Sequence, residues 1–349
     1  MVPATGEIRA WVGGINWKHF QYDHIKQGRR QVGSTFKPFV YATAIMKLGY
    51  TPCTTISNAT FVNGNYRVPG SGGMLTIRDG LAHSKNPIAL RLAEEVGTKN
   101  VIQLARDLGV TEDIDTSLPM ALGASDITIF EMLGAYSTFA NFGNYIKPEM
   151  IWRIEDANGR VIKEVQPEQK EVMHEKYAYT MIDIMMGVAK YGTASGELRR
   201  RGVPANVEIA GKTQNNSDGW FMGITPNLAT GVWVGWEDRA THFYSTSEGQ
   251  GAKMALPIWI IFMKKVWNDR SLGIRMDDKF IKPSDWNGGC GDLPNSKNGY
   301  GDIQGLQTLD ELKNSEENQE KLPKTEINKP EHQNINDNLN QSNDIDFNQ

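Results

Sequence analysis

Gly33-Ser34-Thr35-Phe36-Lys37 is the stretch that decides the fold, because it opens an apolar run of helical character. Gly33 is a plausible break in regular structure before a helix, and serine is a residue type preferred at helix starts. Over residues 36–48, apolar side chains recur three or four positions apart, which predicts a helix. Ser34 and Lys37 are then one turn apart on the same helix face, so the serine hydroxyl and the lysine amine can meet.

This pair of side chains suits nucleophilic catalysis. A serine needs a base to become a nucleophile, and a desolvated lysine can serve as one. Backbone N–H groups at a helix start favour the negative charge that develops on an attacked carbonyl oxygen. A Ser-x-x-Lys pattern is expected roughly once by chance in a chain of this length, so the rest of the sequence decides its meaning.

The composition describes a globular chain of one large domain or two ordinary ones. It has 349 residues, 39% of them hydrophobic, and nine tryptophans, enough for a substantial core. The net charge is −4, and no basic stripe indicates nucleic acid. Cys53 and Cys290 are too few for a disulfide framework, lie in no metal-ligand spacing and leave the redox compartment open. The most apolar run, residues 255–263, is too short to cross a bilayer.

The remaining pattern predicts short helices and an antiparallel sheet. The predicted elements are a strand over 6–13, the helix over 36–48, a turn-rich connection over 51–73, several short helices over 75–142, a hairpin over 147–165, a helix over 177–191, strands over 207–213, 220–224 and 230–236, and a closing helix over 257–267. A strand and helix, a helical insertion and then a sheet with a packed helix predict an α+β fold.

Two further motifs stand where a serine acyl-transfer site needs them. Ser84-Lys85-Asn86 lies in a break between predicted helices, and Lys212-Thr213 ends a predicted strand. Similar copies occur at Ser296-Lys297-Asn298 and at Lys324-Thr325. Both copies lie in polar sequence, where no packed helix or strand would hold them to useful precision. Position and context therefore select Ser84 and Lys212.

Ser-x-x-Lys, Ser-x-Asn and Lys-Thr in this order resemble the motifs of the penicillin-binding protein transpeptidases and the serine β-lactamases. The chain is similar to the C-terminal half of the bifunctional class A enzymes over roughly residues 5 to 270. The similarity extends to Thr5-Gly6-Glu7, Gln31-Val32-Gly33 and Asp218-Gly219-Trp220-Phe221. It implies an antiparallel sheet flanked by helices with an all-helical insertion, and no cofactor or metal.

The resemblance also implies a domain organisation. Residues 1–270 would form the transpeptidase domain, 271–313 an irregular extension, and 314–349 a disordered tail rich in Asn, Gln and Glu. We expect a fragment that lacks the glycosyltransferase domain and membrane anchor of class A enzymes. Its N-terminal strand would be truncated, with only Met1-Val2-Pro3 remaining. The parent protein would work in the cell envelope, at the periplasmic face of the inner membrane.

In the family, the first two motifs carry the acyl transfer. Ser34 would attack the carbonyl between two D-alanines, expelling the terminal one and leaving an acyl-enzyme. Lys37 would take the serine proton, and burial together with the Lys212 cation would favour its neutral form. Ser84 would relay a proton between Lys37 and the leaving amine.

Substrate binding follows from the same resemblance. Asn86 would hold the substrate amide, and Lys212 and Thr213 would bind the substrate carboxylate. The partners would be peptidoglycan stem peptides ending in D-Ala-D-Ala, with an amine of a second stem peptide resolving the acyl-enzyme. β-Lactams would acylate Ser34 because they mimic that peptide end.

The third motif departs from the family. It reads Lys212-Thr213-Gln214 instead of Lys-Thr-Gly, and the loop before Trp220 is shorter by about three residues than the family pattern. A side chain in the glycine position would crowd the substrate backbone. The second donor of the oxyanion hole would have to come from Asn215. We therefore expect a preserved fold and much slower acylation.

Two alternatives from other classes remain open. One is a degenerate, non-catalytic penicillin-fold module that binds peptides or proteins. The other is a serine β-lactamase, which would need a base for deacylation, with Glu131 as a weak candidate. His83 is an unsuitable base for Ser84, because adjacent side chains rarely face each other and a Ser-Lys site needs no histidine.

Overall fold

The computed structural model describes residues 1–214, 218–238, 241, 248–284, 286, 288 and 290. Four features singled out in the sequence lie outside these residues. They are Asn215, residues 291–313 of the predicted extension, the predicted tail over 314–349, and the motif copies at Ser296 and Lys324.

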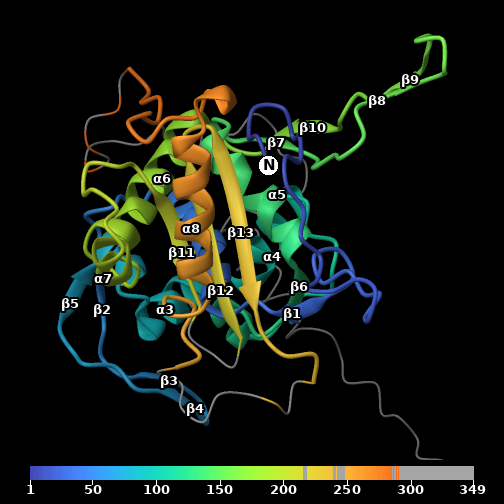
Figure 1. The fold of residues 1–349 in the computed structure, drawn as a ribbon. Coiled ribbons are helices and arrows are strands. Elements are labelled where there is room, and N and C mark those ends of the chain that lie inside the picture. Colours follow the sequence, from blue (N-terminus) through green and yellow to red (C-terminus); the bar gives the residue numbers. More distant parts are fainter. Residues whose placement is uncertain are drawn as a thin grey trace, which may run out of the picture. The chain divides into compact units, whose positions relative to one another are not determined.

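Short elements dominate the described part of the chain (Figure 1). The α-helices there are α1 (Lys37–Leu48), α2 (Ile77–Ala82), α3 (Asn86–Val96), α4 (Thr98–Asp107), α5 (Ile129–Ala140), α6 (Glu175–Lys190), α7 (Ser195–Arg200) and α8 (Ala255–Asn268). The strands there are β1 (Arg29–Gln31), β2 (Thr55–Ser57), β3 (Phe61–Asn63), β4 (Tyr66–Val68), β5 (Met74–Thr76), β6 (Asp126–Thr128), β7 (Asn144–Ile146), β8 (Arg153–Glu155), β9 (Val161–Glu164), β10 (Gln169–Glu171), β11 (Ala210–Thr213), β12 (Gly219–Thr225) and β13 (Leu228–Val234). Three 3-10 turns cover Gly33–Phe36, Leu118–Leu122 and Arg270–Leu272.

The main sheet is antiparallel, in the order β11-β12-β13. Side chains of β12 alternate between its two faces, as strand geometry requires. Trp220 and Met222 enter the large core that also contains α5 and α6, whereas Phe221 packs with Trp259 of α8 in a second core. Figure 1 shows α8 in front of the sheet and α5 and α6 behind it. The sheet is therefore buried on both faces.

Helix α1 runs through the large core. Its residues from Lys37 to Met46 are all buried, and it packs against α3, α4 and α6. This explains why the predicted run is apolar nearly all round instead of on one face. A helix buried in this way is a rigid support for the side chains at its start.

Most predicted elements are confirmed. The helices predicted over 36–48, 177–191 and 257–267 are α1, α6 and α8, and the helices predicted over 75–142 include α2 to α5. The three predicted strands are β11, β12 and β13, although β11 begins three residues later and β13 two residues earlier than expected. The predicted hairpin is the β8–β9 pair.

The strand predicted over 6–13 is wrong. Glu7 makes an isolated parallel bridge with Glu149, and the described structure has no strand in this segment. Alternating side chains do not make a strand unless a neighbouring strand pairs with the backbone along its length. Here the backbone bonds are scattered: Gly6 and Ile8 bond to Glu149, Gly6 and Glu7 to Val2, and Gly13 to His24. The connection over 51–73 carries β2, β3 and β4, each of three residues and therefore too short for a detectable pattern.

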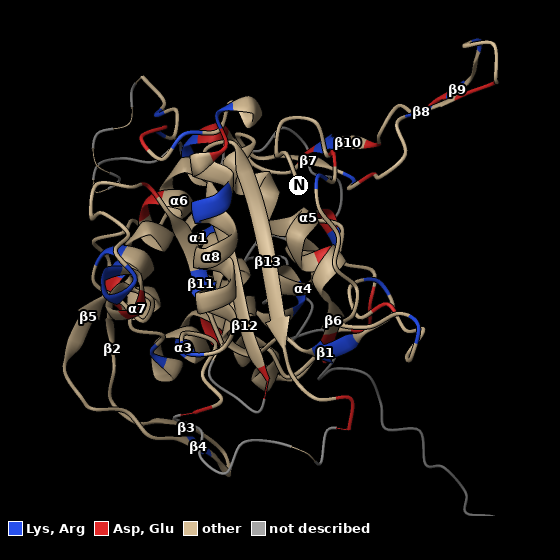
Figure 2. Ribbon diagram, viewed as in Figure 1, with Lys and Arg blue, Asp and Glu red and all other residues tan. Residues whose placement is uncertain are grey.

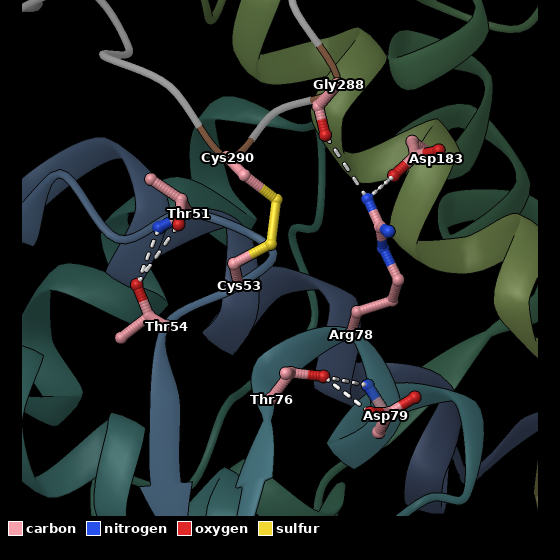
Figure 3. Close-up of a disulfide and its surroundings, with 9 residues drawn as sticks. All are labelled: Thr51, Cys53, Thr54, Thr76, Arg78, Asp79, Asp183, Gly288 and Cys290. Carbon is pink, nitrogen blue, oxygen red and sulfur yellow. Dashed lines mark hydrogen bonds and ion pairs between the residues drawn. A yellow bond between two sulfur atoms is a disulfide. The ribbon is translucent and has the colours of Figure 1, made fainter.

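A disulfide joins Cys53 to Cys290, a pairing that the sequence left open (Figure 3). The two Cα atoms are 5.5 Å apart, and the residues are separated by 237 positions. Nearby, Arg78 of α2 forms an ion pair with Asp183 of α6 and donates to the Gly288 carbonyl at 3.4 Å. The C-terminal part of the described chain is thus fastened beside α2 and α6.

Charged residues of both signs are interspersed in the view of Figure 2. This agrees with the nearly balanced composition and shows no single-sign face on that side. No described helix combines the length and the apolar character that a membrane span requires.

Candidate active site

Ser34 lies in the 3-10 turn that leads into α1. Gly33 adopts a positive φ of 50°, a conformation that favours glycine, and its N–H donates to the Gly123 carbonyl at 2.9 Å. The Tyr136 hydroxyl donates to the Thr35 carbonyl at 2.6 Å from within the core. Two buried contacts therefore fix the turn on both sides of Ser34, whose own side chain is only half buried.

Lys37 is fully buried one turn after Ser34. Its Nζ donates to the Ser84 carbonyl at 2.8 Å, to Ser84 Oγ at 3.2 Å and to Asn86 Oδ1 at 2.6 Å. An ammonium group could donate to all three oxygens, whereas the neutral amine donates to two of them and can accept a hydrogen bond from the Ser84 hydroxyl. The first and second motifs are thus joined directly, as the sequence predicted from their order.

Ser84 holds the centre of the site. It ends α2 in a left-handed conformation with φ of 55°, which is uncommon for a residue with a side chain. Its N–H donates to the Leu81 carbonyl and the next N–H, of Lys85, donates to the Gly80 carbonyl. This is the Schellman ending of a helix, with serine in the position that glycine usually fills. Such a strained residue persists only where the surroundings hold it, and it is typical of functional sites.

The Ser84 hydroxyl meets three functional groups. Its Oγ donates to Ser34 Oγ at 3.1 Å and accepts from Lys37 Nζ and, at 2.9 Å, from Lys212 Nζ. In the described residues, Lys37 Nζ makes no hydrogen bond to Ser34 itself. The hydrogen-bonded route between the nucleophile and either lysine therefore runs through Ser84.

Lys212 and Thr213 approach the site from β11. Both side chains are fully buried. Lys212 Nζ donates to the Thr213 carbonyl as well as to Ser84, at 2.9 Å each. The Thr213 hydroxyl shares a 2.7 Å hydrogen bond with the hydroxyl of Thr193, in the connection between α6 and α7. The third motif therefore contacts the second through Lys212 and Ser84, and the hydrogen bond to Thr193 holds the Thr213 hydroxyl.

The electrostatics favour a neutral lysine. Burial lowers the pKa of Lys37 well below its ordinary value, and repulsion from Lys212 lowers that pKa further. Burial also lowers the pKa of Lys212, to about 7. Two ammonium groups on one hydroxyl repel each other in a medium of low dielectric constant. Burial and the Lys212 charge both lower the pKa of Lys37 and so favour its neutral form, the form that can act as a base.

Gln214 occupies the family's glycine position with its side chain turned inward. It is 1% exposed, and its Nε2 donates to the Gln31 carbonyl at 3.0 Å. A Cβ atom on Gly33 would lie 2.6 Å from Gln214 Cγ, so the glutamine fills the space beside the nucleophile turn. Its Oε1 is buried and has no hydrogen-bond partner among the residues that the structure describes. Asn215, the expected second donor, lies outside the described residues.

Two residues weighed in the sequence stand apart from the site. Glu131 accepts from the backbone N–H and the hydroxyl of Thr111, and no hydrogen bond within the described part joins it to Ser34, Lys37 or Ser84. His83 is exposed, with its ring 5.9 Å from that of Tyr191. The described residues contain no cluster of three or more His, Cys, Asp or Glu side chains able to hold a metal.

Two supporting residues, buried Tyr136 and half-buried Thr193, escaped the sequence analysis. Tyr136 and Thr193 reach the site through contacts with residues 101 and 20 positions away. Neither contact belongs to a local motif, so no signal in this single sequence marks them. Their role is to hold the backbone of Thr35 and the hydroxyl of Thr213.

The chain matches a known protein family. Residues 1–248 match the family model described as "Penicillin binding protein transpeptidase domain". Penicillin-binding protein 1A of Aquifex aeolicus is 34% identical over 278 residues, which cover 75% of this chain and 36% of that protein. Penicillin-binding protein 1A of Neisseria lactamica is 32% identical over 79% of this chain and 36% of its own length. The chain thus spans about a third of these relatives.

Solved structures agree. Penicillin-binding protein 1A of Haemophilus influenzae superposes with a TM-score of 0.70 at 25% identity, over 77% of this chain and 47% of that one. PonA1 of Mycobacterium tuberculosis in complex with penicillin V gives a TM-score of 0.70 at 23% identity, over 84% of this chain and 82% of that one. The second likeness shows the shared fold alone.

Proposed function

This chain belongs to the penicillin-binding protein transpeptidase family, and we propose that it is a peptidoglycan D,D-transpeptidase domain that works through an acyl-enzyme on Ser34. One observation carries the proposal. The Ser84 hydroxyl is hydrogen-bonded at once to the proposed nucleophile Ser34 and to the buried lysines Lys37 and Lys212. The lowered pKa values of the two lysines support the proposal, because such shifts are common at functional sites.

Acylation follows from these contacts. Ser34 Oγ attacks the carbonyl carbon and gives its proton to Ser84 Oγ, while the Ser84 hydroxyl turns to give its own proton to the neutral Lys37 amine. The Ser34 N–H donates to the oxyanion as one member of the oxyanion hole. Collapse of the tetrahedral intermediate breaks the amide bond, and the proton returns through Ser84 to the leaving D-alanine amine. The product is an ester between Ser34 and the donor peptide.

The substrate would be a stem peptide ending in D-Ala-D-Ala. Lys212 and Thr213 would attract its terminal carboxylate, and Asn86, which is exposed and lies against Lys37 Nζ, would hold its amide. An amine of a second stem peptide would then attack the ester and release Ser34. β-Lactams would acylate the same serine, as a neighbour of the same fold solved with penicillin V suggests.

We place this activity in the cell envelope. The Cys53–Cys290 disulfide favours that location, because disulfides persist in oxidising compartments such as the periplasm. Both cysteines are exposed, so a reducing cytosol would reach them.

A non-catalytic penicillin-fold module is the second candidate. It is favoured by Gln214, whose buried side chain fills the space beside Gly33 in place of the family's glycine. A β-lactamase receives less support, since Glu131 is bound to Thr111 and not to the serine cluster.

Covalent labelling with a fluorescent penicillin tests the proposal. We expect slow labelling of this chain that survives denaturation, and faster labelling after Gly-Thr-Thr is inserted between Thr213 and Gln214. Absence of label in both proteins would reject the proposal and favour the binding module. Rapid turnover of a chromogenic cephalosporin without accumulation of label would favour the β-lactamase.

A further inference from the structure

Arg30 is an almost fully buried cation four residues before Ser34. It is the central residue of β1, opposite Ile127 of β6. A buried guanidinium group is costly unless its donors and charge are matched by partners. Its partners should therefore show what holds it there.

The partners lie at one end of the main sheet. The Arg30 guanidinium donates to the Trp236 carbonyl and, at 3.0 Å, to the Glu237 carbonyl, both just after β13. Arg30 Nε lies 4.0 Å from Asp218 Oδ2, just before β12. The guanidinium also lies over the ring of Trp233, 5.1 Å from its centroid. Figure 1 shows β13 ending close to β1.

These partners are tied to one another. Trp233 Nε1 donates to Asp218 Oδ2 at 3.2 Å, and the strands pair through Gly219 opposite Val234. One guanidinium thus joins the start of β12 to the end of β13. Its Nη2 donates to both carbonyls while its planar face lies over an indole, and lysine has no planar group to place there.

The same sheet end carries the third motif. Thr213 pairs with Phe221, and Gln214 N–H donates to the Trp220 carbonyl. Gln31, the residue after Arg30, accepts a hydrogen bond from Gln214 Nε2 through its carbonyl oxygen. The short segment from Arg30 to Ser34 therefore holds the nucleophile and, through Arg30, the sheet that presents Lys212.

We propose that Arg30 is a positioning residue that sets the distance between Ser34 and the Lys212-bearing sheet. It touches no reacting atom, and its partners are the backbone and side chains at the open ends of β12 and β13. Loss of the guanidinium frees the sheet end to move relative to Ser34. The effect on rate rests on the proposed acylation of Ser34, whereas the effect on the backbone does not.

The experiment compares Arg30→Met and Arg30→Lys with Arg29→Met. Arg29 is the matched control because it is next in sequence but exposed, with its ion pair to Glu112 at the surface. Each variant is made in this chain and in the protein with Gly-Thr-Thr inserted after Thr213. Stopped-flow measurement with a fluorescent penicillin separates the acylation rate constant from the dissociation constant of the first complex.

We expect both Arg30 variants to lower the acylation rate constant about 10- to 100-fold, the size of effect that a misplacement of about 1 Å produces. The dissociation constant should change less than about threefold in the same series, because ground-state binding is retained. Arg29→Met should leave both constants unchanged. Equal behaviour of Arg30→Met and Arg29→Met, or a loss of rate matched by the fraction unfolded, would overturn the proposal.

Amide hydrogen exchange keeps the test independent of activity. In the Arg30 variants, residues 31–36 and 218–222 should exchange faster, while α3 and α4 should be unchanged. Unaltered exchange at both segments would reject the positioning role even in a protein that never reacts with penicillin. If Arg30→Met fails to fold, the same exchange measurement on Arg30→Lys, which retains the charge, tests the positioning role.

Discussion

The helical side and the strand side of the site differ in how completely their buried polar atoms are hydrogen-bonded. On the helical side, Ser34, Lys37 and Ser84 lie at the ends of buried helices, and the polar atoms of the two motifs satisfy one another. On the strand side, Lys212 is well bonded, but Gln214 buries an amide oxygen for which the described part of the chain supplies no partner. An unsatisfied buried polar atom typically costs about 1–3 kcal/mol.

The difference shows which parts of such a site depend on local geometry. The helical side needs a spacing of three residues along one helix and a left-handed serine after another. By resemblance to the family, we expect the strand side to need a glycine and a loop about three residues longer after Thr213, where this sequence has Gln214. We therefore expect the helical side to set whether acylation occurs and the strand side to limit how fast it occurs.

Removal of the base should have the largest effect. Lys37→Ala should lower the acylation rate by about 10²–10⁴-fold, the usual contribution of a general base. Fluorescent-penicillin labelling over time measures this rate. Lys85→Ala is the control, because Lys85 is the middle residue of Ser84-Lys85-Asn86 and has no place in the bonded cluster. Equal losses in both variants would argue against Lys37 as the base.

Repair of the strand side should have the next largest effect. Inserting Gly-Thr-Thr between Thr213 and Gln214 should raise the acylation rate by about 10²-fold or more, because a correctly placed oxyanion donor contributes that much. Inserting Ala-Thr-Thr restores the loop length without the glycine, and its rate should fall between the two. An unmodified chain as fast as the Gly-Thr-Thr protein would show that the two sides are equally competent.

The charge of Lys212 gives a pH dependence. Its pKa is lowered to about 7, so it is cationic below that pH and loses its proton above it. Binding of a substrate carboxylate should therefore weaken as pH rises, by up to about tenfold per unit above 7. Calorimetric binding of a D-Ala-D-Ala peptide to Ser34→Ala measures this without acylation.

Lys212→Arg provides the matched control for that titration. Arginine keeps its charge throughout this range, so the affinity of this variant should vary little between pH 6 and about 9. A pH-independent affinity in the Lys212 protein, or a fall with the same slope in both, would exclude Lys212 as the titrating group.

The disulfide should affect stability but hardly affect the chemistry. Cys53→Ser should lower the free energy of unfolding by about 2–4 kcal/mol, because the bond closes a long loop in the unfolded chain. Acylation should change less than about twofold, since α1 is held by its own burial. Thermal denaturation and penicillin labelling measure the two effects. A large loss of acylation in the folded variant would mean that the disulfide supports the helical side.

The sequence predicts the helical side well. Helix geometry puts Lys37 one turn after Ser34, although in the described structure their side chains are joined through Ser84 and not directly. The order of the three motifs selects Ser84 and Lys212 from their copies. The predicted helices are long enough for their periodicity to be seen. These features depend on local spacing, which a single sequence records.

Other features depend on distant parts of the chain. The β1–β6 pair consists of three residues on each side and forms because residues 29–31 and 126–128 meet in the fold. The inward position of the Gln214 side chain depends on Gly33 and Gln31, far away in sequence. The segment 6–13 alternates like a strand, but its backbone bonds go to Val2, His24 and Glu149 separately instead of to one paired strand. None of these contacts leaves a local pattern.

Mass spectrometry of the penicillin adduct tests the central claim most directly. The chain and its Gly-Thr-Thr insertion protein are incubated with penicillin, digested and mapped, with Ser34→Ala as the matched control. We predict one adduct, on the peptide that contains Ser34, formed faster in the insertion protein and absent from Ser34→Ala. An adduct on another peptide, or one that persists in Ser34→Ala, would contradict the assignment of Ser34 as the nucleophile.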